Sequence, residues 1–338
     1  MGYPEILGIL FIFYVLFNKL LVKKNLFLDP GKSLAHKSFL NQSDKVPFSG
    51  GILILLSCLI FLSSEYLVFK FFLLSIFLIG IMSDLEILKS PAKRIILQIL
   101  IVITFLIISE TLIKSVKIDF LDSFLEIYYF KLLFTMFCLL ILLNGTNFLD
   151  GVNTLVSTYY IMIISFILYL KYQFNFSFET EALNIVLLAL IVFLIFNTFG
   201  KVYLGDNGSY LLSALVGVIL INISNNNELI SPYFVACLLW YPAYENLFSI
   251  MRKMLKKYSP SKPDNNHLHQ LIFKKLKQKL KFKKEILNTF TGILINLYNL
   301  FIFLIAVNNF SNTKILALIL IVNMLIYTSL YAVLKKGA

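Results

Sequence analysis

Three aspartates interrupt long apolar runs in this chain, and each stands among residues that favour turns. Asp84 follows one apolar run, Asp150 lies within NGTNFLDGVN, and Asp206 lies within GDNGS. A single aspartate of this kind is often only a helix cap or a solvated turn. Three of them, with amide side chains nearby, offer the oxygen ligands that Mg²⁺ prefers, with Mn²⁺ as the alternative. The spacing predicts a divalent metal site wherever the three meet.

Glycines adjoin two of the polar segments. Gly205, Gly208 and Ser209 surround Asp206 near the expected start of a helix. Free backbone N–H groups at a helix start favour anions, so this turn could bind a phosphate, although short glycine turns are common in loops. The segment PFSGG at 47–51 precedes another apolar run. Its two glycines indicate close helix packing, a bend around a substrate or a simple turn.

Two of the three histidines form the pair His267–Leu268–His269, which follows an asparagine-rich turn. The pair could ligate a metal, but two imidazoles without cysteine or a third histidine are weak support for zinc. Contact with a diphosphate and a merely solvated loop are the other two interpretations. The lysine-rich run 274–284 favours a helix lying on an anionic membrane surface over a substrate site.

The composition places these polar segments in a membrane protein. Of the 338 residues, 59% are hydrophobic and only 14% are charged, whereas soluble domains are near a quarter charged. Lipid must therefore cover part of the apolar surface. The formal charge of +12 predicts anionic partners, either lipid headgroups or an anionic substrate. Nucleic acid is disfavoured, because the basic residues adjoin apolar runs and no DNA-reading motif is visible.

The apolar runs predict an all-α, polytopic protein with about eleven transmembrane helices, because a bilayer core needs roughly 20 helical residues. The expected spans are 4–22, 48–64, 66–83, 92–109, 130–146, 152–170, 182–199, 207–223, 230–250, 287–307 and 313–334. Neither an internal repeat nor a long linker is evident, so residues 1–338 are expected to form one membrane domain, with a basic cytoplasmic loop at 251–286.

The basic residues predict the orientation of these spans. With the N-terminus outside and the C-terminus in the cytoplasm, the cytoplasmic segments and the flanking Lys93 and Arg94 hold 23 of the 30 Lys and Arg residues. These segments are 23–47, 84–91, 144–151, 200–206, 251–286 and 335–338. Every polar segment described above then lies on the cytoplasmic face. We therefore expect a site there, at the boundary between lipid and cytosol.

Taken in order, these segments resemble motifs of the polyprenyl-phosphate N-acetylhexosamine-1-phosphate transferases. This superfamily of polytopic phosphoglycosyltransferases includes the phospho-N-acetylmuramoyl-pentapeptide transferase. The resemblance covers about residues 1–275 and rests on five segments in the family's order: PFSGG, SDLEILKSPAKRIILQ, NGTNFLDGVN, FNTFGKVYLGDNGS and PDNNHLHQ.

The chain departs from the family pattern at several positions. The family usually has Asp-Asp where this chain has Ser83–Asp84, a second aspartate where Asn153 stands, and a third imidazole where Gln270 stands. The basic or histidine position before Pro-x-x-Gly-Gly has no clean match, and Gln42 and Lys45 flank it. An altered sugar preference or a lost activity is therefore compatible with the sequence.

The resemblance implies the transfer of a sugar-1-phosphate from a UDP-sugar to undecaprenyl phosphate in the bacterial cytoplasmic membrane, with UMP released. The product would begin the synthesis of a cell-surface polysaccharide such as O-antigen, capsule or a wall polymer. The donor sugar stays open among GlcNAc, GalNAc and deoxy-amino sugars. The oligomeric state is not readable either, because lipid-facing and partner-facing helices have the same composition, and a homodimer stays open.

The resemblance also implies roles for individual residues. Asp206 is expected to bind Mg²⁺, and Asp84 to assist the metal or orient the acceptor phosphate. Asn144, Asn147 and Asp150 would hold the metal environment or the nucleotide. His267 and His269 would bind the diphosphate. The candidate counter-charges for phosphate are Lys45, Lys93, Arg94 and Lys201.

Ser83 is expected to be compatible with turnover. The first aspartate of the family's pair is often regarded as a general base. A phosphate monoester has its second pKa near ~6, so most of the acceptor is already a dianion at neutral pH. A general base typically accelerates a reaction by about 10²–10⁴-fold, but an acceptor that is already deprotonated gains little from one.

Two other classes of function stay open. A transporter would place its polar residues near the bilayer midplane, often in broken helices, whereas here they fall at span ends on one face. An inactive scaffold of a polysaccharide assembly complex is the second alternative to the enzyme, and the departures from the family pattern motivate it.

Overall fold

The computed structural model describes residues 2–29, 46–257, 259 and 264–336. These residues fold into helices without a β-strand, apart from one isolated antiparallel bridge between Leu28 and Pro47. The elements are α1 (Tyr3–Lys24), α2 (Gly50–Phe61), the 3₁₀ turn η2 (Ser64–Tyr66), α3 (Leu67–Asp84), α4 (Pro91–Ser109), α5 (Asp119–Leu125), α6 (Tyr128–Leu149), α7 (Leu155–Phe174), α8 (Glu181–Thr198), α9 (Gly205–Asn226), α10 (Pro232–Leu255), α11 (Leu268–Lys279), α12 (Lys284–Asn308) and α13 (Thr313–Lys336).

Each of the eleven expected spans corresponds to one of these helices. In the described part of the chain, nine helices are long and apolar enough to cross a membrane. The other two correspond to α2, which has 12 residues, and α10, which carries Pro242, Glu245 and Asn246 in its interior. The all-α, polytopic class is thus confirmed. The number of crossings and the side on which each terminus lies stay predictions.

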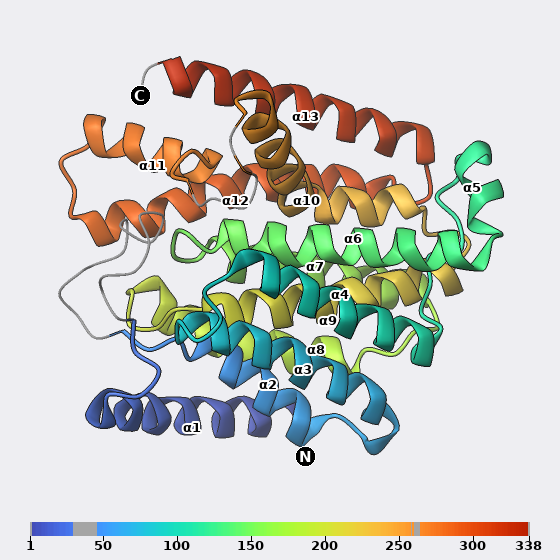
Figure 1. The fold of residues 1–338 in the computed structure, drawn as a ribbon. Helices are drawn as coiled ribbons and strands as arrows, with labels where there is room; N and C mark the ends of the chain where they lie inside the picture. Colours follow the sequence, from blue (N-terminus) through green and yellow to red (C-terminus); the bar gives the residue numbers. More distant parts are fainter. Residues whose placement is uncertain (1, 30–45, 258, 260–263, 337–338) are drawn as a thin grey trace.

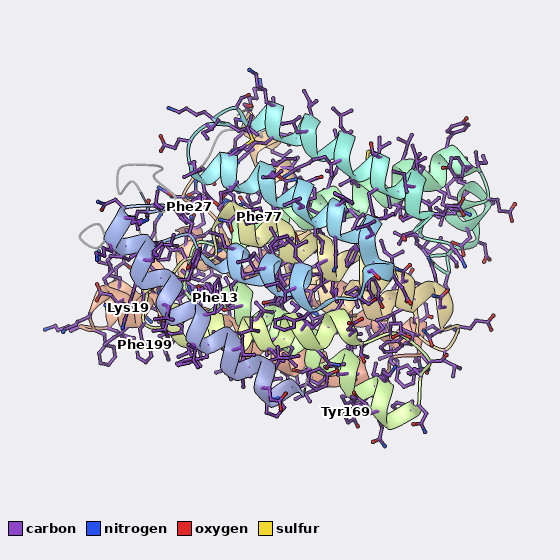
Figure 2. All side chains as sticks on the ribbon, turned by 90° about the horizontal axis from the view of Figure 1, so that it is seen from below. Phe13, Lys19, Phe27, Phe77, Tyr169 and Phe199 are labelled. Carbon is purple, nitrogen blue, oxygen red and sulfur yellow. The ribbon has the colours of Figure 1, made fainter. Side chains whose placement is uncertain are left out.

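The long helices lie side by side, with α9 in the middle of the bundle (Figure 1). Helix α9 packs against α2, α3 and α6, and most of its residues are buried. Small residues such as Gly217 make this close packing possible, because a side chain there would meet Leu139 and Leu142. The outer helices instead expose large apolar side chains, including Phe13 on α1 and Tyr169 on α7 (Figure 2). This surface is suited to contact with lipid.

Two glycines set the position of the first turn of α9. A Cβ on Gly51 of α2 would lie 2.0 Å from Asn207 Oδ1 and 2.5 Å from the Gly208 nitrogen. A Cβ on Gly80 of α3 would lie 2.3 Å from the Asn207 Cα. The second glycine of PFSGG therefore permits close packing between helices, which was one of the three interpretations of that segment.

The connections between helices collect at the two ends of the bundle. Helix α5 lies at one end, and α11 lies at the other together with the end of α13 (Figure 1). Helix α11 falls inside the expected basic loop at 251–286, and its residues Leu268, His269 and Leu271 are buried. That segment is therefore partly an ordered, packed helix. The polar segments meet at the same end as α11, as the contacts below show.

Candidate functional site

Asp84 docks the start of α9 onto the end of α3. Its Oδ1 accepts a hydrogen bond from the Asp206 backbone nitrogen at 2.9 Å. Its Oδ2 accepts from the Asn207 backbone nitrogen at 2.9 Å and from Asn207 Nδ2 at 2.6 Å. The first backbone N–H groups of a helix have no partner within the helix, and negative charge is favoured there. Asp84 is thus a cap supplied from another helix.

Asp150 makes the same kind of contact from the end of α6. Its Oδ2 accepts from the Gly205 backbone nitrogen at 3.0 Å, and Gly205 has a φ of +77°, which glycine tolerates. Two carboxylates of the chain therefore occupy the N–H groups at the start of α9. The expectation that this helix start binds a phosphate is wrong for these groups, because Asp84 and Asp150 already supply the anion.

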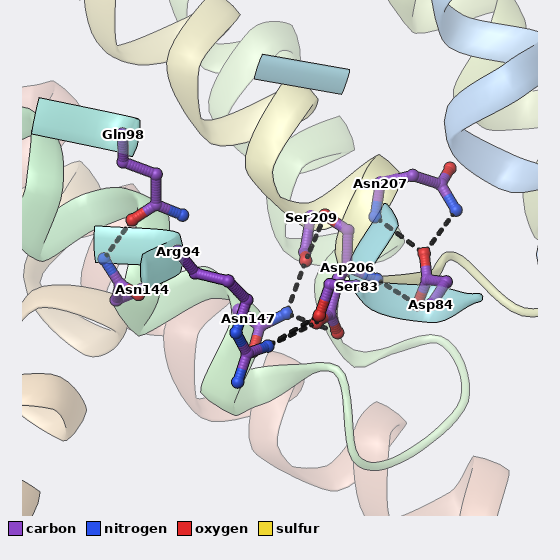
Figure 3. Close-up of polar contacts among 9 residues, drawn as sticks. All are labelled: Ser83, Asp84, Arg94, Gln98, Asn144, Asn147, Asp206, Asn207 and Ser209. Atoms are coloured by element: carbon purple, nitrogen blue, oxygen red, sulfur yellow. Dashed lines mark hydrogen bonds and ion pairs between the residues drawn. The ribbon is translucent and has the colours of Figure 1, made fainter. Parts of the chain in front are cut away.

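Asp206 points toward a different set of partners (Figure 3). Its Oδ2 accepts from Arg94 Nη1 at 2.9 Å and from Ser83 Oγ at 2.6 Å. Its Oδ1 accepts from Asn147 Nδ2 at 2.8 Å, and the same amide donates to Ser209 Oγ at 3.1 Å. The Asp206–Arg94 contact is a charge-assisted hydrogen bond, a stronger class than one between neutral groups.

These contacts define the carboxylate cluster, whose members come from α3, α4, α6 and α9: Ser83, Asp84, Arg94, Asn147, Asp150 and Asp206. Arg94 also donates to Ser83 Oγ at 2.7 Å, so Ser83 lies between the guanidinium and the carboxylate. The Arg94 and Asp206 side chains are 22% and 12% exposed. The pair is therefore reachable from solvent but largely enclosed, which strengthens its electrostatic interaction relative to an exposed pair.

The other expected amide and the described lysines have different surroundings. Asn144 is one helical turn before Asn147, and its amide donates to Gln98 Oε1 at 3.0 Å (Figure 3). Lys93 and Lys201 are exposed to solvent. The predicted phosphate-binding residue Lys45 lies outside the described residues. The substrate-binding roles of these residues stay predictions.

The metal site that was expected where the three aspartates meet stays a prediction. Among the residues that the structure describes, no three His, Cys, Asp or Glu side chains form a group that could hold a metal ion. Mg²⁺ is usually bound through one or two carboxylates, with substrate phosphates and waters supplying the other oxygens. Asp206 fits that requirement, because its partners are the side chains of Ser83, Asn147 and Arg94. Both oxygens of each carboxylate accept hydrogen bonds, but Asp84 fits the requirement less well, since it holds backbone N–H groups of α9, which cannot rotate away as side chains can.

A second group of polar residues surrounds the two histidines at the start of α11. His267 Nδ1 lies 2.9 Å from Oε1 of Glu245, a buried residue of α10. The Phe148 ring contacts the His267 ring at a centroid distance of 5.0 Å. The two imidazoles are nearly parallel, with centroids 5.8 Å apart. His269 is fully buried and lies against Gly151, where a Cβ would approach its Nε2 to 2.4 Å.

Asp264 ties this loop to the end of α10. It accepts a hydrogen bond from Arg252 Nη1 at 2.7 Å, and His267 Nε2 lies 3.7 Å from its Oδ1. Partial burial alone would raise the pKa of Asp264. The hydrogen bond from Arg252 and the nearby positive charges, including Lys253, outweigh that effect and lower the pKa to about 2. Asp264 is therefore a carboxylate at physiological pH.

We call this second group the histidine cluster, and its members are Glu245, Arg252, Asp264, His267 and His269. It adjoins the carboxylate cluster through α6. Phe148 and Gly151, which contact the imidazoles, flank Asp150, which binds the start of α9. His267 and His269 are therefore packed against the helix end that carries Asp150, and the interpretation as a solvated loop pair is wrong.

The departures from the family pattern have different surroundings. Ser83 is inside the carboxylate cluster, as described. Asn153 lies in the turn after α6, where its backbone nitrogen donates to Asn288 Oδ1 of α12 at 2.6 Å. Gln270 accepts at Oε1 from the His267 backbone nitrogen at 3.1 Å, so it caps α11. Ser83 is thus the departure with direct contact to Asp206.

Sequence reasoning overlooked Glu245, Arg252 and Asp264. Asp264 and the histidines share one segment, PDNNHLHQ, but the aspartate received no role. Glu245 is a lone carboxylate inside an expected span, which is by itself a signal for a functional site. Its partner, 22 positions along the chain, is not indicated by any local pattern.

Comparisons with known proteins agree with the motifs. The model of the family described as glycosyl transferase family 4 matches residues 66–224, which contain all three aspartates. An undecaprenyl-phosphate alpha-N-acetylglucosaminyl 1-phosphate transferase of Thermotoga maritima is 27% identical over 258 residues, which is 75% of each chain. The enzyme of that name from Salmonella typhi is 25% identical over 280 residues, 78% of this chain and 73% of that protein.

A Bacillus subtilis protein named as a probable undecaprenyl-phosphate N-acetylglucosaminyl 1-phosphate transferase is 23% identical over 200 residues, covering 58% of this chain and 55% of that protein. Together, these matches are to the same family that the motifs resemble.

Proposed function

We propose that this chain, a relative of the polyprenyl-phosphate N-acetylhexosamine-1-phosphate transferases, transfers a sugar-1-phosphate from a UDP-sugar to undecaprenyl phosphate. An oxygen of the acceptor phosphate forms a bond to the sugar-bearing phosphorus of the donor. The bond from that phosphorus to the oxygen of UMP breaks, so UMP leaves and a polyprenyl-diphospho-sugar remains. We further propose that the reaction occurs at the cytoplasmic face of a bacterial cytoplasmic membrane and begins a surface polysaccharide.

The observation that carries this proposal is the meeting of Asp84, Asp150 and Asp206 at one end of the bundle. The three come from helices far apart in sequence, and the first turn of α9 joins them. A site at the end of membrane helices can receive a lipid phosphate from the bilayer and a nucleotide from the aqueous side. Phosphoryl transfer needs in-line positioning and charge neutralisation more than covalent catalysis, and this arrangement supports both.

The two aspartates that cap α9 would hold the frame, and Asp206 would face the substrates. Arg94 supplies a positive charge beside Asp206 for the phosphate oxygens. Asn147 fixes the Asp206 carboxylate from the other side. If Mg²⁺ is bound, Asp206 and oxygens of the substrate diphosphate would hold it, and the ion would neutralise charge that develops on the departing UMP. Ser83 would orient Asp206 and Arg94, because its hydroxyl contacts both.

The test is an assay of the purified chain in lipid nanodiscs with undecaprenyl phosphate and Mg²⁺. A panel of UDP-sugars, beginning with UDP-N-acetylglucosamine and including UDP-N-acetylgalactosamine and deoxy-amino sugars, is scored by UMP release and by extraction of the lipid product. We expect UMP release from at least one donor, dependent on the acceptor lipid.

Absence of UMP release from every donor, together with retained folding, would contradict the proposal. Failure of Mg²⁺ and nucleotide to bind, with retained binding of assembly partners, would favour the scaffold. Proton-coupled flux of a solute in liposomes without UMP release would favour a transporter.

A further inference from the structure

Glu245 is an acidic side chain buried in the interior of an otherwise apolar helical segment. It lies on α10, three residues after Pro242, and is 1% exposed. A charged residue inside a membrane helix is costly to insert, less so toward the helix end. An apolar side chain at this position would often make the protein equally stable, because a buried ion pair contributes little net stability. Its contacts therefore indicate a functional reason for its presence.

Two donors converge on the Glu245 carboxyl group from different parts of the fold. Tyr327 of α13 donates from its hydroxyl to Oε2 at 2.7 Å, and its ring is buried. His267 Nδ1 lies 2.9 Å from Oε1. A carboxylate can only accept hydrogen bonds, so the hydrogen of this contact belongs to Nδ1 of the imidazole. The carboxylate is thereby fixed at both oxygens, and the ring is fixed at one nitrogen.

The other edge of the His267 ring faces the charged groups of the loop. Nε2 lies 3.7 Å from Asp264 Oδ1, and Asp264 is paired with Arg252. Lys253 Nζ lies 5.9 Å from the centre of the Phe148 ring, which contacts His267. The ring is therefore held between a buried carboxylate on one side and a mixed-charge surface on the other. The Nδ1 edge thus faces the buried Glu245, whereas the Nε2 edge faces the loop that carries Asp264.

We propose that Glu245, itself held by Tyr327, is the positioning residue of His267. It keeps the imidazole hydrogen on Nδ1 and directs the Nε2 edge toward the nucleotide side of the site. This inference rests on the proposed function, in which His267 contacts the diphosphate of the donor. Glu245 acts through the histidine and does not itself touch substrate. Helix α13 thereby contributes to the site through one tyrosine hydroxyl.

The first measurement uses the folded chain without substrate. The protein has only three histidines, so its imidazole ¹⁵N–¹H spectrum in nanodiscs is simple, and the His267 signals are those lost in His267→Gln. We expect a protected Nδ1 proton on His267 in the wild-type chain. We expect that proton to exchange rapidly with water in Glu245→Leu, which removes the acceptor. Absence of a protected Nδ1 proton in the wild-type chain, or its persistence in Glu245→Leu, would overturn the proposal.

The second measurement asks whether Glu245 acts through His267 during turnover. We expect Glu245→Leu to lower kcat/KM by about 10–100-fold, as loss of a group that orients an active-site histidine commonly does. Glu245→Gln, which keeps an acceptor, should lose less. In a chain that already carries His267→Gln, the further change Glu245→Leu should have little effect, because residues acting as a unit are not additive. Equal losses in both backgrounds would show a merely structural role.

A control for general disturbance of the C-terminal helices is a hydrogen bond between α12 and α13. Tyr298 of α12 donates its hydroxyl to Asn323 Oδ1 of α13, a partly buried contact that does not involve His267. Tyr298→Phe removes a hydrogen bond to α13 that does not reach Glu245, so it should leave both the Nδ1 signal and turnover within about twofold of the wild type. If no UDP-sugar is turned over but the Nδ1 proton behaves as expected, the proposed function fails while the positioning of His267 by Glu245 stands.

Discussion

The carboxylate cluster and the histidine cluster use acidic side chains for different purposes. In the carboxylate cluster, Asp84 and Asp150 accept backbone N–H groups at the start of α9, so they hold one helix in place. In the histidine cluster, Glu245 accepts from side chains, so it orients a ring rather than a helix. Asp206 instead directs its carboxylate to a guanidinium, a hydroxyl and an amide. Neighbouring carboxylates in one site thus carry separate structural and chemical roles.

The largest effect is expected at Asp206. Asp206→Asn removes the charge that pairs with Arg94 while keeping the shape of the side chain. We expect kcat/KM to fall by roughly 10²–10³-fold, the scale for losing one preorganised electrostatic group. The measurement is transfer of labelled sugar phosphate into lipid extracts. Asp122→Asn is the control, because Asp122 accepts hydrogen bonds from Ser115 and Val116 near α5, at the other end of the bundle. Full activity of Asp206→Asn would reject this assignment.

Substitution of Asp84 should mainly lower stability, whereas substitution of Asp206 should mainly lower activity. Asp84→Asn replaces an acceptor of three N–H groups by an amide that can accept at only one atom. We expect a loss of about 1–3 kcal/mol in the free energy of unfolding, because buried donors lose their partner. Thermal unfolding in detergent measures it, with Asp122→Asn again as the control. An unchanged unfolding temperature would show that Asp84 is not the anchor of α9.

A loss of stability similar to that of Asp84→Asn is expected from a glycine in the packing of α2 on α9. Gly51→Ala would place a Cβ within 2.5 Å of the Gly208 backbone nitrogen, and we expect a destabilisation of about 1–3 kcal/mol from overpacking. Gly8→Ala on α1 is the matched control, because nothing lies within 4 Å of its Cβ position. That variant should be neutral or slightly stabilising, since alanine favours a helix over glycine by about 1 kcal/mol. Equal unfolding temperatures for the two variants would contradict the packing argument.

The smallest effect is expected at Ser83. Ser83→Ala removes a hydroxyl that contacts Asp206 and Arg94, but the direct contact between those two residues remains. Hydrogen bonds to charged groups contribute about 1.5–3 kcal/mol, but the direct contact keeps both charges paired, so activity should fall by about tenfold or less. Turnover at saturating donor measures it. A loss as large as that of Asp206→Asn would mean that Ser83 takes part directly in the chemistry.

Much of the carboxylate cluster could be predicted from the sequence. The apolar runs predicted the helices, because a membrane span has a characteristic length and composition. The three aspartates stood at the ends of those runs, and the structure brings all three to the start of α9. Their separate roles were not predictable, because whether a carboxylate meets a backbone N–H or a side chain depends on how α3, α6 and α9 are rotated. Asn144 and Asn147 show this, since one helical turn separates a partner of Gln98 from a partner of Asp206.

The histidine cluster was harder to predict for a related reason. Its histidines were visible as a pair, but Glu245 lies within an apolar helix and Tyr327 lies 82 positions further along. Contacts over such separations arise from the packing of α10 against α13 and leave no local pattern in the sequence. The burial of His269 against Gly151 likewise depends on a tertiary contact.

The most direct test of the division of roles is equilibrium binding of UDP-N-acetylglucosamine in nanodiscs, titrated with and without Mg²⁺. Three folded chains are compared: the wild type, Asp206→Asn and Asp84→Asn. If Asp206 faces the diphosphate and Asp84 holds the helix, Mg²⁺ should strengthen binding in the wild type and in folded Asp84→Asn but not in Asp206→Asn. Unchanged enhancement by Mg²⁺ in Asp206→Asn would contradict the account.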